Sequence, residues 1–251
     1  MARRIHVQHL RAGDVPLDAA QAHHARDVLR LTDGQRVEVF DDAGRVAPGV
    51  LVIAGGEVFV RVEAHDVTEA DAAGPRLTIA AAVPKADRAD WMVEKLSELG
   101  VAEFIPLAAE RSVVLPEGRN KRDRWARIAT EAAKQSRRAG VMGIGELTPV
   151  EKALERAGVD GGKAWFLSTE APSPVAVSDA LRDLPAAAPL TAFIGPEGGW
   201  TEREVRQFHA AGAVAVGLTR TVLRVETAAV ATAAVVGAFR SPWRGPSSGA
   251  A

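Results

Sequence analysis

The sequence contains no cysteine. This absence excludes a disulfide framework, thiolate metal sites and cysteine nucleophiles, and it fits a reducing compartment. No covalent cross-link is needed for stability, because a chain of 251 residues buries most of its apolar surface on folding. The composition, with 47% hydrophobic and 25% charged residues, is typical of one large or two modest globular domains. We therefore expect a soluble, cytoplasmic protein.

Long apolar runs are also missing. The longest, residues 227–239, has 13 residues, whereas a helix needs roughly 20 to span a bilayer. Arg3 and Arg4 near the N-terminus are not followed by an apolar segment, so we expect no signal peptide. Residues 227–239 are apolar nearly all round, which is more than a surface helix needs. They therefore predict a helix that buries part of a dimer interface.

Neither sign of charge dominates, since the formal net charge is −1. That value alone argues against a nucleic-acid partner, but it averages two unlike regions. Residues 1–74 carry 8 basic and 12 acidic side chains, whereas residues 111–138 carry 9 basic and 3 acidic ones. Because counterion release depends on local contacts with phosphate, residues 111–138 are a candidate RNA-binding stretch. A solvated helix face is the alternative.

Several motifs of nucleotide-binding and hydrolytic enzymes are absent or misplaced. No Gly-x-Gly-x-x-Gly follows a predicted strand, and residues 158–163 imitate a P-loop but place Ala164 where Ser or Thr would ligate magnesium. Residues 245–249 match Gly-x-Ser-x-Gly, but they lie in a terminal tail without the flanking strand and helix. No spacing of His, Asp and Glu suggests a metal site, so we expect no metal.

The texture of the sequence changes at residues 69–75, a small, polar stretch with Gly and Pro that predicts a linker. Residues 1–74 have short β-branched segments punctuated by glycines, which predict a small β-rich domain with one helix. In residues 75–244 apolar strands alternate with helices, which favours an α/β domain with a mainly parallel sheet. Residues 245–251 are expected to form a flexible tail. We predict strands at 36–40, 50–53, 58–62, 77–83, 104–107, 164–167, 191–194 and 214–218, and helices at 18–31, 87–99, 122–138, 201–211 and 227–239.

A glycine-rich segment, residues 193–200, leaves one predicted strand and enters a helix that Thr201 and Glu204 cap. Its three glycines permit close approach of the backbone to a ligand, and Pro196 limits the freedom of the loop. In open α/β sheets, ligands bind at the carboxyl ends of the strands. The segment is therefore a candidate ligand-binding loop, with a tight structural turn as the alternative.

A second segment, residues 216–228, also leaves a predicted strand and enters an Ala-rich helix. Arg224 and Glu226 place charges at the entrance to this apolar helix, where solvent exposure is not the obvious explanation. They are candidates for a functional role, and a capping or ion-pair role is the alternative.

Four segments in a fixed order carry a family resemblance. Two of them are Ile194-Gly195-Pro196-Glu197-Gly198-Gly199 and Leu223-Arg224-Val225-Glu226-Thr227-Ala228, and residues 95–101 and 131–138 precede them. Over about residues 3–240 the chain closely resembles the RsmE family, the 16S ribosomal RNA uracil-N3 methyltransferases of the SPOUT superfamily. His23, His24, residues 28–30 and Gly34 are similar to that family's PUA-like RNA-binding domain.

The resemblance implies an N-terminal small β-barrel of PUA-like type and a C-terminal SPOUT domain whose chain forms a trefoil knot. It implies a homodimer that uses S-adenosyl-L-methionine and acts on 16S ribosomal RNA or the small ribosomal subunit. The residues implied for cofactor binding are Leu167, Ser168, Thr169, Ile194, Gly195, Gly198, Gly199, Leu218 and Leu223. Those proposed for RNA binding are Arg3, Arg4, His24, Arg30, Arg111, Arg137 and Arg138, and the candidate catalytic residues are Arg224, Glu197 and Glu226.

The chain departs from the family pattern in the second segment. The family usually has Leu-Gly-Pro-Arg-Ile-Leu-Arg at residues 218–224, where this chain has Thr219 in place of the glycine and Thr221 in place of the arginine. Met142 also replaces a proline after the basic helix. We therefore place more weight on Leu218 and Arg224 than on residues 219–221.

Methylation of a uracil imide sets the chemistry that these residues must support. The donor methyl is already activated, so the protein must mainly align donor and acceptor. The imide nitrogen must lose its proton, or the resulting anion must be stabilised. We assign Arg224 to that anion or to phosphate, while Glu197 and Glu226 remain candidates for the base or for orienting Arg224. The alternatives are a SPOUT methyltransferase acting on another RNA and a non-catalytic RNA-binding protein, which would not bind S-adenosylmethionine.

Overall fold

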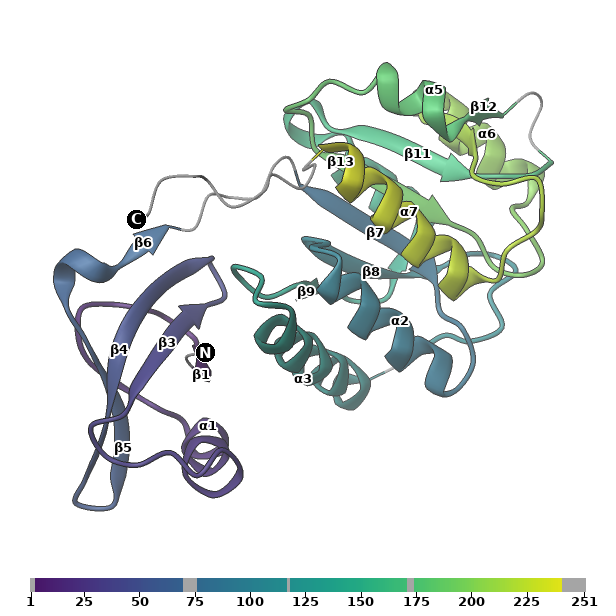
Figure 1. Cartoon of the computed structure of the whole chain (residues 1–251). Coiled ribbons are helices and arrows are strands. Elements are labelled where there is room, and N and C mark those ends of the chain that lie inside the picture. Colours follow the sequence, from purple (N-terminus) through teal and green to yellow (C-terminus); the bar gives the residue numbers. More distant parts are fainter. Residues whose placement is uncertain (1–2, 70–75, 117, 171–173, 241–251) are drawn as a thin grey trace. The chain divides into compact units, whose positions relative to one another are not determined.

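The computed structural model describes residues 3–69, 76–116, 118–170 and 174–240. Most of the predicted linker and the whole predicted tail, residues 245–251, lie outside the described residues. The chain forms two compact units, which Figure 1 shows. Unit 1 comprises residues 1–73 and 130–141, and unit 2 comprises residues 74–129 and 142–251.

Unit 1 contains a six-stranded sheet in the order β1-β3-β4-β5-β2, with β6 paired to β4. β1 and β3 are parallel, and the other pairs are antiparallel. Alternation along β5 buries Val58, Val60 and Val62 on one face, as expected for a half-buried strand. The elements are β1 Arg3–Val7, β2 Gly13–Pro16, α1 Ala19–His23, the π-helical turn His24–Val28, β3 Arg36–Asp41, β4 Arg45–Ala54, β5 Glu57–Val62, the 3₁₀ turn Ala64–Asp66 and β6 Thr68–Glu69.

The second segment of unit 1, residues 130–141, packs against β1 and the turn between β3 and β4. Arg4 on β1 donates a hydrogen bond from Nη1 to the carbonyl oxygen of Ala133, at 3.2 Å. Gly140 has φ +75°, and a Cβ atom there would lie 3.2 Å from the carbonyl oxygen of Asp42, so the two backbones approach each other closely. These contacts explain why a segment distant in sequence belongs to this unit.

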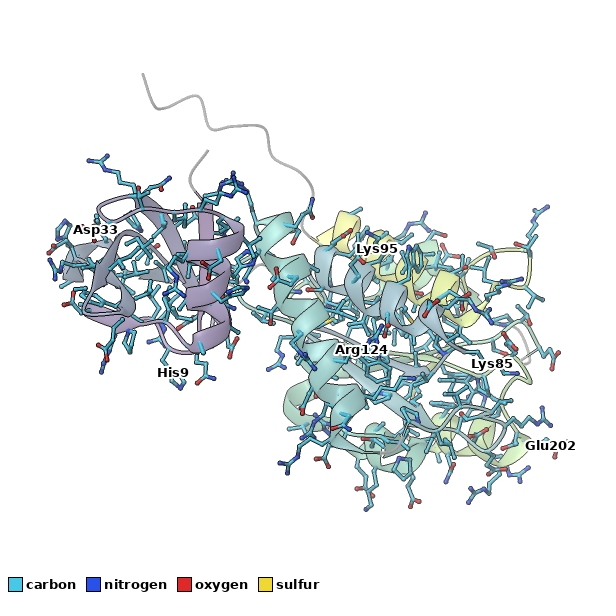
Figure 2. All side chains as sticks on the ribbon, turned by 90° about the horizontal axis from the view of Figure 1, so that it is seen from below. His9, Asp33, Lys85, Lys95, Arg124 and Glu202 are labelled. Carbon is cyan, nitrogen blue, oxygen red and sulfur yellow. The ribbon has the colours of Figure 1, made fainter. Side chains whose placement is uncertain are left out.

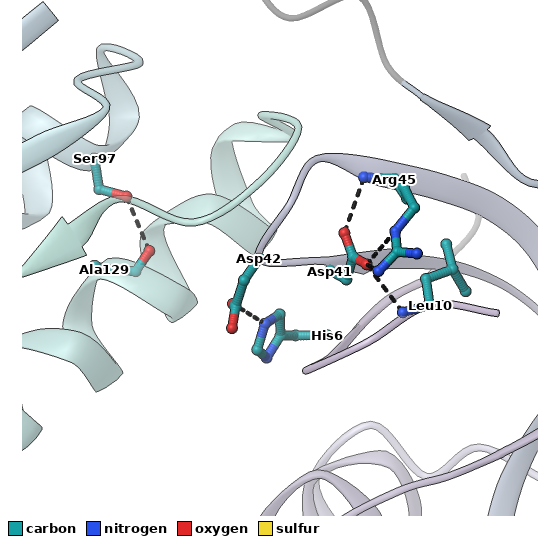
Figure 3. A network of polar contacts seen from close by, with 7 residues as sticks. All are labelled: His6, Leu10, Asp41, Asp42, Arg45, Ser97 and Ala129. Carbon is teal, nitrogen blue, oxygen red and sulfur yellow. Dashed lines mark hydrogen bonds and ion pairs between the residues drawn. The ribbon is translucent and has the colours of Figure 1, made fainter. Parts of the chain in front are cut away.

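A buried carboxylate fixes the end of β3 (Figure 3). Asp41 accepts hydrogen bonds from the backbone N–H of Leu10 at 2.9 Å, from the backbone N–H of Arg45 at 2.9 Å and from Arg45 Nε at 2.7 Å. The neighbouring Asp42 lies 2.7 Å from His6 Nε2. Because hydrogen bonds to a charged acceptor are stronger than neutral ones, this network holds the segment after β1 against the β3–β4 turn.

Unit 2 contains an eight-stranded sheet in the order β10-β8-β7-β13-β11-β14-β12, with β9 paired to β8. Every strand pair among its described residues is parallel, so the prediction of a mainly parallel sheet is confirmed. The strands are β7 Leu77–Ala82, β8 Glu103–Ala108, β9 Gly143–Ile144, β10 Thr148–Pro149, β11 Lys163–Leu167, β12 Val175–Ala176, β13 Leu190–Ile194 and β14 Val214–Gly217.

Helices pack on this sheet as a parallel architecture requires. α7 packs against α2 and lies along β7 and β13 (Figure 1). α6 brings Phe208 onto Phe166 of β11, with stacked ring centroids 4.6 Å apart, and onto Phe193 of β13. The helices are α2 Asp87–Glu98, α3 Arg119–Ser136, α4 Val150–Ala157, the 3₁₀ turn Val159–Gly161, α5 Val177–Arg182, α6 Glu202–Ala210 and α7 Val225–Arg240.

Two helix boundaries were specified by local chemistry, and both predictions are confirmed. α2 ends in a Schellman arrangement in which Gly100 has φ +81° and the N–H of Val101 donates to the Leu96 carbonyl oxygen at 3.1 Å. α6 begins with a capping box between Thr201 and Glu204. The sequence therefore fixes where the loop after β13 stops.

Other elements differ from the prediction. The helix predicted at 18–31 ends at Val28 because Arg30 adopts a left-handed conformation, with φ 54°. The short strands β1 and β2 and the short helices α4 and α5 were not predicted. The trefoil knot stays a prediction of the resemblance. In the described ranges no helix is long and apolar enough to cross a membrane.

Candidate functional site

The loops after three neighbouring strands of unit 2 line one cavity of about 570 Å³. β11 pairs in parallel with both β13 and β14, so the carboxyl ends of these strands meet at one edge of the sheet. Figure 2 shows Lys85, which follows β7, and Glu202, which begins α6, at this end of the unit. The cavity is lined by all nine residues implied for cofactor binding, namely Leu167, Ser168, Thr169, Ile194, Gly195, Gly198, Gly199, Leu218 and Leu223.

Trp200 forms a wall that joins two of these loops. Its indole Nε1 donates a hydrogen bond to the carbonyl oxygen of Leu167 at 2.9 Å. A Cβ atom at residue 195 would lie 2.8 Å from Cε2 of this indole, closer than real contacts allow. Glycine at 195 therefore makes room for Trp200, and the close approach of a ligand to this backbone stays a prediction.

The other two glycines of the loop also have structural reasons. A Cβ atom at Gly198 would lie 3.3 Å from Cβ of Arg111, and Gly199 has φ +71°, a conformation that favours glycine. The N–H of Gly199 donates to the Pro196 carbonyl oxygen at 2.8 Å. The segment is thus a tight structural turn that also lines the cavity.

Arg111, which we expected to bind RNA phosphate, lies against this loop. Its Nη1 donates to the carbonyl oxygen of Gly198 at 2.7 Å. The buried Glu204 on α6 binds the residue before Arg111, because its Oε1 accepts a hydrogen bond from the N–H of Glu110 at 2.9 Å. A hydrogen bond from Arg203 lowers the pKa of Glu110 below its usual range. These contacts fasten the loop after β13 to the end of β8.

The third loop contains the residues that depart from the family pattern. Thr219 Oγ1 donates to the carbonyl oxygen of Thr221 at 2.8 Å, which closes the loop on itself. Val222 is 83% exposed, whereas Leu223 is half-buried in the cavity wall. The threonine hydroxyl therefore supplies a local constraint where the family has glycine and proline.

Of the three candidate catalytic residues, Glu226 pairs with Arg88 and not with Arg224, the partner that the ion-pair alternative required. Arg224 is exposed, and no carboxylate of the described chain lies within ion-pair distance of its guanidinium. Glu226 is buried, with 6% exposure, and its Oε1 lies 3.3 Å from Nη1 of Arg88. The same Nη1 lies 3.9 Å from Oε1 of Glu197, which lines the cavity. The ion pair considered between Arg224 and Glu226 is therefore replaced by one between Arg88 and Glu226.

Sequence reasoning missed Arg88. It lies in the first turn of α2, directly after the carboxyl end of β7, the edge where ligands bind in such sheets. This position after a strand end was the feature of the sequence that could have identified Arg88 as a site residue. Ala86, just before it, has φ 53° and ψ −138°, a conformation rare for a residue with a side chain. This turn aims Arg88 at the first turn of α7.

Six of the seven residues proposed for RNA belong to unit 1. The first group of four reaches the surface, and the second group of two, which includes Arg4, is directed toward the protein. Arg3, Arg30 and Arg137 are exposed and His24 is half-buried. Arg4 is buried, pairs with Glu38 at 2.6 Å and lies over the Phe40 ring.

The second group, Arg4 and Arg138, faces the protein. Nη1 of Arg4 donates to the carbonyl oxygen of Arg138 at 3.0 Å. Burial lowers the pKa of Arg138 to about 10, which leaves it cationic at neutral pH. We correct the assignment of Arg4 to RNA, because its guanidinium already has protein acceptors and almost no access to solvent.

Two family profiles match the chain. Residues 72–237 match a family described as the RNA methyltransferase domain, and residues 17–63 match the RNA methyltransferase PUA domain. The chain is 32% identical to the ribosomal RNA small subunit methyltransferase E of Bacillus subtilis, over 83% of each chain. It is 31% identical to the protein of the same name from Synechocystis, over 90% of this chain and 73% of that one.

Solved structures extend the similarity to the fold. The ribosomal RNA small subunit methyltransferase E from Neisseria gonorrhoeae, bound to S-adenosyl methionine, superposes with a TM-score of 0.78 at 26% identity, covering 94% of this chain and 96% of that one. A Legionella pneumophila protein in complex with the bound cofactor SAM gives a TM-score of 0.80 at 26% identity, covering 95% and 98% of the two chains.

Proposed function

Because the chain belongs to the RsmE family of RNA methyltransferases, we propose that it transfers a methyl group from S-adenosylmethionine to N3 of a uridine in 16S ribosomal RNA. The observation that carries the proposal is the single cavity formed by the loops after β11, β13 and β14. Relatives with 26% identity and the same fold are solved with this cofactor. We also propose that the chain forms a homodimer.

The cavity is large enough to hold a nucleoside. Its volume of about 570 Å³ lies within the range of about 300–1,000 Å³ typical of ligand pockets. Apolar side chains of Ile194, Leu218 and Leu223 line it beside glycine backbone that can approach a ligand closely. S-adenosylmethionine supplies an activated methyl sulfonium when bound. The chain's own task is then to hold the uracil in line with the donor and to remove its imide proton.

Arg224 and Glu197 are proposed to act on the uracil. Loss of the N3 proton leaves negative charge on the flanking carbonyl oxygens, and an exposed guanidinium such as that of Arg224 stabilises such charge. Glu197 lines the cavity and is the candidate acceptor of the proton. Glu226 forms an ion pair with Arg88, and Arg88 also lies near Glu197. We therefore assign Glu226 the role of holding Arg88 beside Glu197.

RNA is proposed to contact unit 1 through its exposed cations Arg3, Arg30 and Arg137 and through the half-buried His24. These three arginine side chains lie at the surface, whereas Arg4 is buried. Phosphate contacts of this kind position the RNA without reading its sequence.

The test is a methylation assay with purified protein, S-adenosylmethionine and 16S ribosomal RNA, as naked transcript and as assembled small subunits. Nuclease digestion and mass spectrometry should find one N3-methyluridine. Methylation of a different RNA would assign the chain to another SPOUT activity. Failure to bind S-adenosylmethionine at micromolar concentration would make it a non-catalytic RNA-binding protein.

A further inference from the structure

A second cavity in unit 2, of about 420 Å³, lies beside the start of α3 and is separate from the cofactor cavity. Residues 143–149 run alongside β8, since Gly143 pairs with Glu103 and Thr148 pairs with Leu107. The cavity opens between this strip and α3. It is lined by Pro106, Pro116, Gly118, Arg119, Lys121, Arg122, Trp125, Gly145, Glu146 and Leu147.

The charges that line this basic cavity do not balance. Three cations face one acid, and Nη1 of Arg122 pairs with Oε1 of Glu146 at 2.6 Å. Arg119 and Lys121 remain, and within the described ranges no carboxylate lies at ion-pair distance from either. Two unneutralised cations in one hollow repel each other and favour an anion.

The wall of the basic cavity is rigid. Trp125 is 1% exposed, packs edge-on against Phe104 and donates from Nε1 to Oδ1 of Asp90 at 3.0 Å. Lys121 Nζ lies 5.4 Å from the centre of this indole, a cation–π distance that holds the ammonium over the cavity. Arg124, labelled on α3 in Figure 2, is held by the other oxygen of Asp90. The cations therefore project from a fixed surface.

We propose that the basic cavity binds phosphate groups of the RNA backbone next to the target nucleotide. This inference rests on the proposed function, which supplies the RNA. β7 lies between β8 and β13, so the carboxyl ends of β8 and β13 are about 10 Å apart. A base held at the cofactor cavity would thus leave the phosphates of nearby nucleotides within reach of Arg119 and Lys121. Charged hydrogen bonds from these two side chains would hold the strand in place.

The test compares two double variants of the full chain that remove the same charge. Arg119→Gln/Lys121→Gln removes the two cations of the basic cavity that have no ion-pair partner within the described ranges. Arg127→Gln/Lys152→Gln removes two exposed cations of unit 2 outside it, one of them also on α3. Binding of a 16S ribosomal RNA transcript is measured over a series of KCl concentrations, together with S-adenosylmethionine affinity and melting temperature.

The cavity variant should bind the RNA about 10- to 60-fold more weakly at about 0.1 M salt, with a salt slope shallower by about 1 to 2. The control variant should lose less than about threefold. Cofactor affinity and melting temperature should match those of the wild type in both variants. Arg119→Lys/Lys121→Arg, which keeps both charges, should retain most of the affinity.

An equal loss in the control variant would overturn the inference, because the effect would then be diffuse electrostatics. Unchanged affinity of the cavity variant would overturn it as well. If the wild-type protein itself neither binds nor methylates 16S ribosomal RNA, the proposed function fails, and that outcome is distinct from the other two.

Discussion

At the scale of single residues, the cofactor cavity depends on how closely Trp200 lies to Gly195. We expect Gly195→Ala to weaken S-adenosylmethionine binding by at least about tenfold. The added methyl group would meet the indole at 2.8 Å, and moving the indole would break its hydrogen bond to Leu167. Titration calorimetry measures the affinity. Gly158→Ala is the control, because its Cβ would meet nothing closer than 3.9 Å; unchanged affinity of Gly195→Ala would contradict this account of the wall.

Arg224 should show a kinetic defect without a folding defect. Arg224→Ala is expected to slow single-turnover methylation by at least about tenfold, the loss expected for one charged donor to the transition state. Its melting temperature should stay that of the wild type, because the side chain is exposed and has no ion-pair partner in the described chain. A destabilised variant that turns over normally once folded would show that Arg224 is structural.

Arg88, unlike Arg224, should show a folding defect. Arg88→Ala leaves the buried carboxylate of Glu226 without its cation, and Oε2 of that carboxylate already has no hydrogen-bond partner. We expect the free energy of unfolding to fall by about 1–3 kcal/mol. The double variant Arg88→Ala/Glu226→Gln should recover part of the loss in a urea titration, since no buried charge remains unpaired. No recovery would show that the pair does not act as a unit.

At the scale of elements, the sequence predicted those whose pattern is long or whose ends carry specific chemistry. The buried runs of β7 and β13 and the helices α2, α3, α6 and α7 were all expected. α4 has eight residues and α5 has six, too few for a helical period to stand out. β1 and β2 gain their identity from pairing with distant strands, which a local pattern does not contain.

The same limit governs the site. The three cavity loops were predicted because glycines and sequence motifs mark them, and the structure brings them together. Arg88 was missed because its partner, Glu226, lies 138 residues away in sequence. The burial of Arg4 was missed for a similar reason, since the carbonyl oxygens that accept from it lie in residues 130–141. Charge alone does not tell a buried arginine from an exposed one.

α7 carries the prediction about assembly. Its inner side is buried against the sheet and α2, yet Val235 is 36% and Phe239 is 51% exposed. We propose that these side chains form part of the homodimer interface. Phe239→Glu should shift the protein to a monomer in light scattering at low micromolar concentration, because burying the new charge would be costly. Val159→Glu, at an apolar position elsewhere on unit 2 that is 60% exposed, should leave the dimer intact; a wild-type monomer would contradict the proposal.

At the scale of the whole molecule, unit 1 is discontinuous in sequence, since it needs residues 130–141 as well as 1–73. A fragment of residues 1–73 lacks the carbonyl oxygens that accept from Arg4 and the backbone that packs on the β3–β4 turn. We expect this fragment to melt at a lower temperature than one in which a Gly/Ser linker joins it to residues 119–141. Circular dichroism of the two fragments measures the difference. Equal melting temperatures would mean that the second segment adds no stability.

The discontinuity also delays the completion of unit 1 during synthesis on the ribosome. The six strands of unit 1 leave the exit tunnel first, but the unit is complete only after residue 141 has emerged. At about 5–20 residues per second, the ribosome takes roughly 4 to 14 seconds to add the 72 residues from 70 to 141. During that interval Arg4 lacks the carbonyl oxygens of Ala133 and Arg138 that accept from it, while β7, α2 and β8 of unit 2 are already being made. Unit 1 therefore begins to fold first, but it cannot finish folding until part of unit 2 has been synthesised.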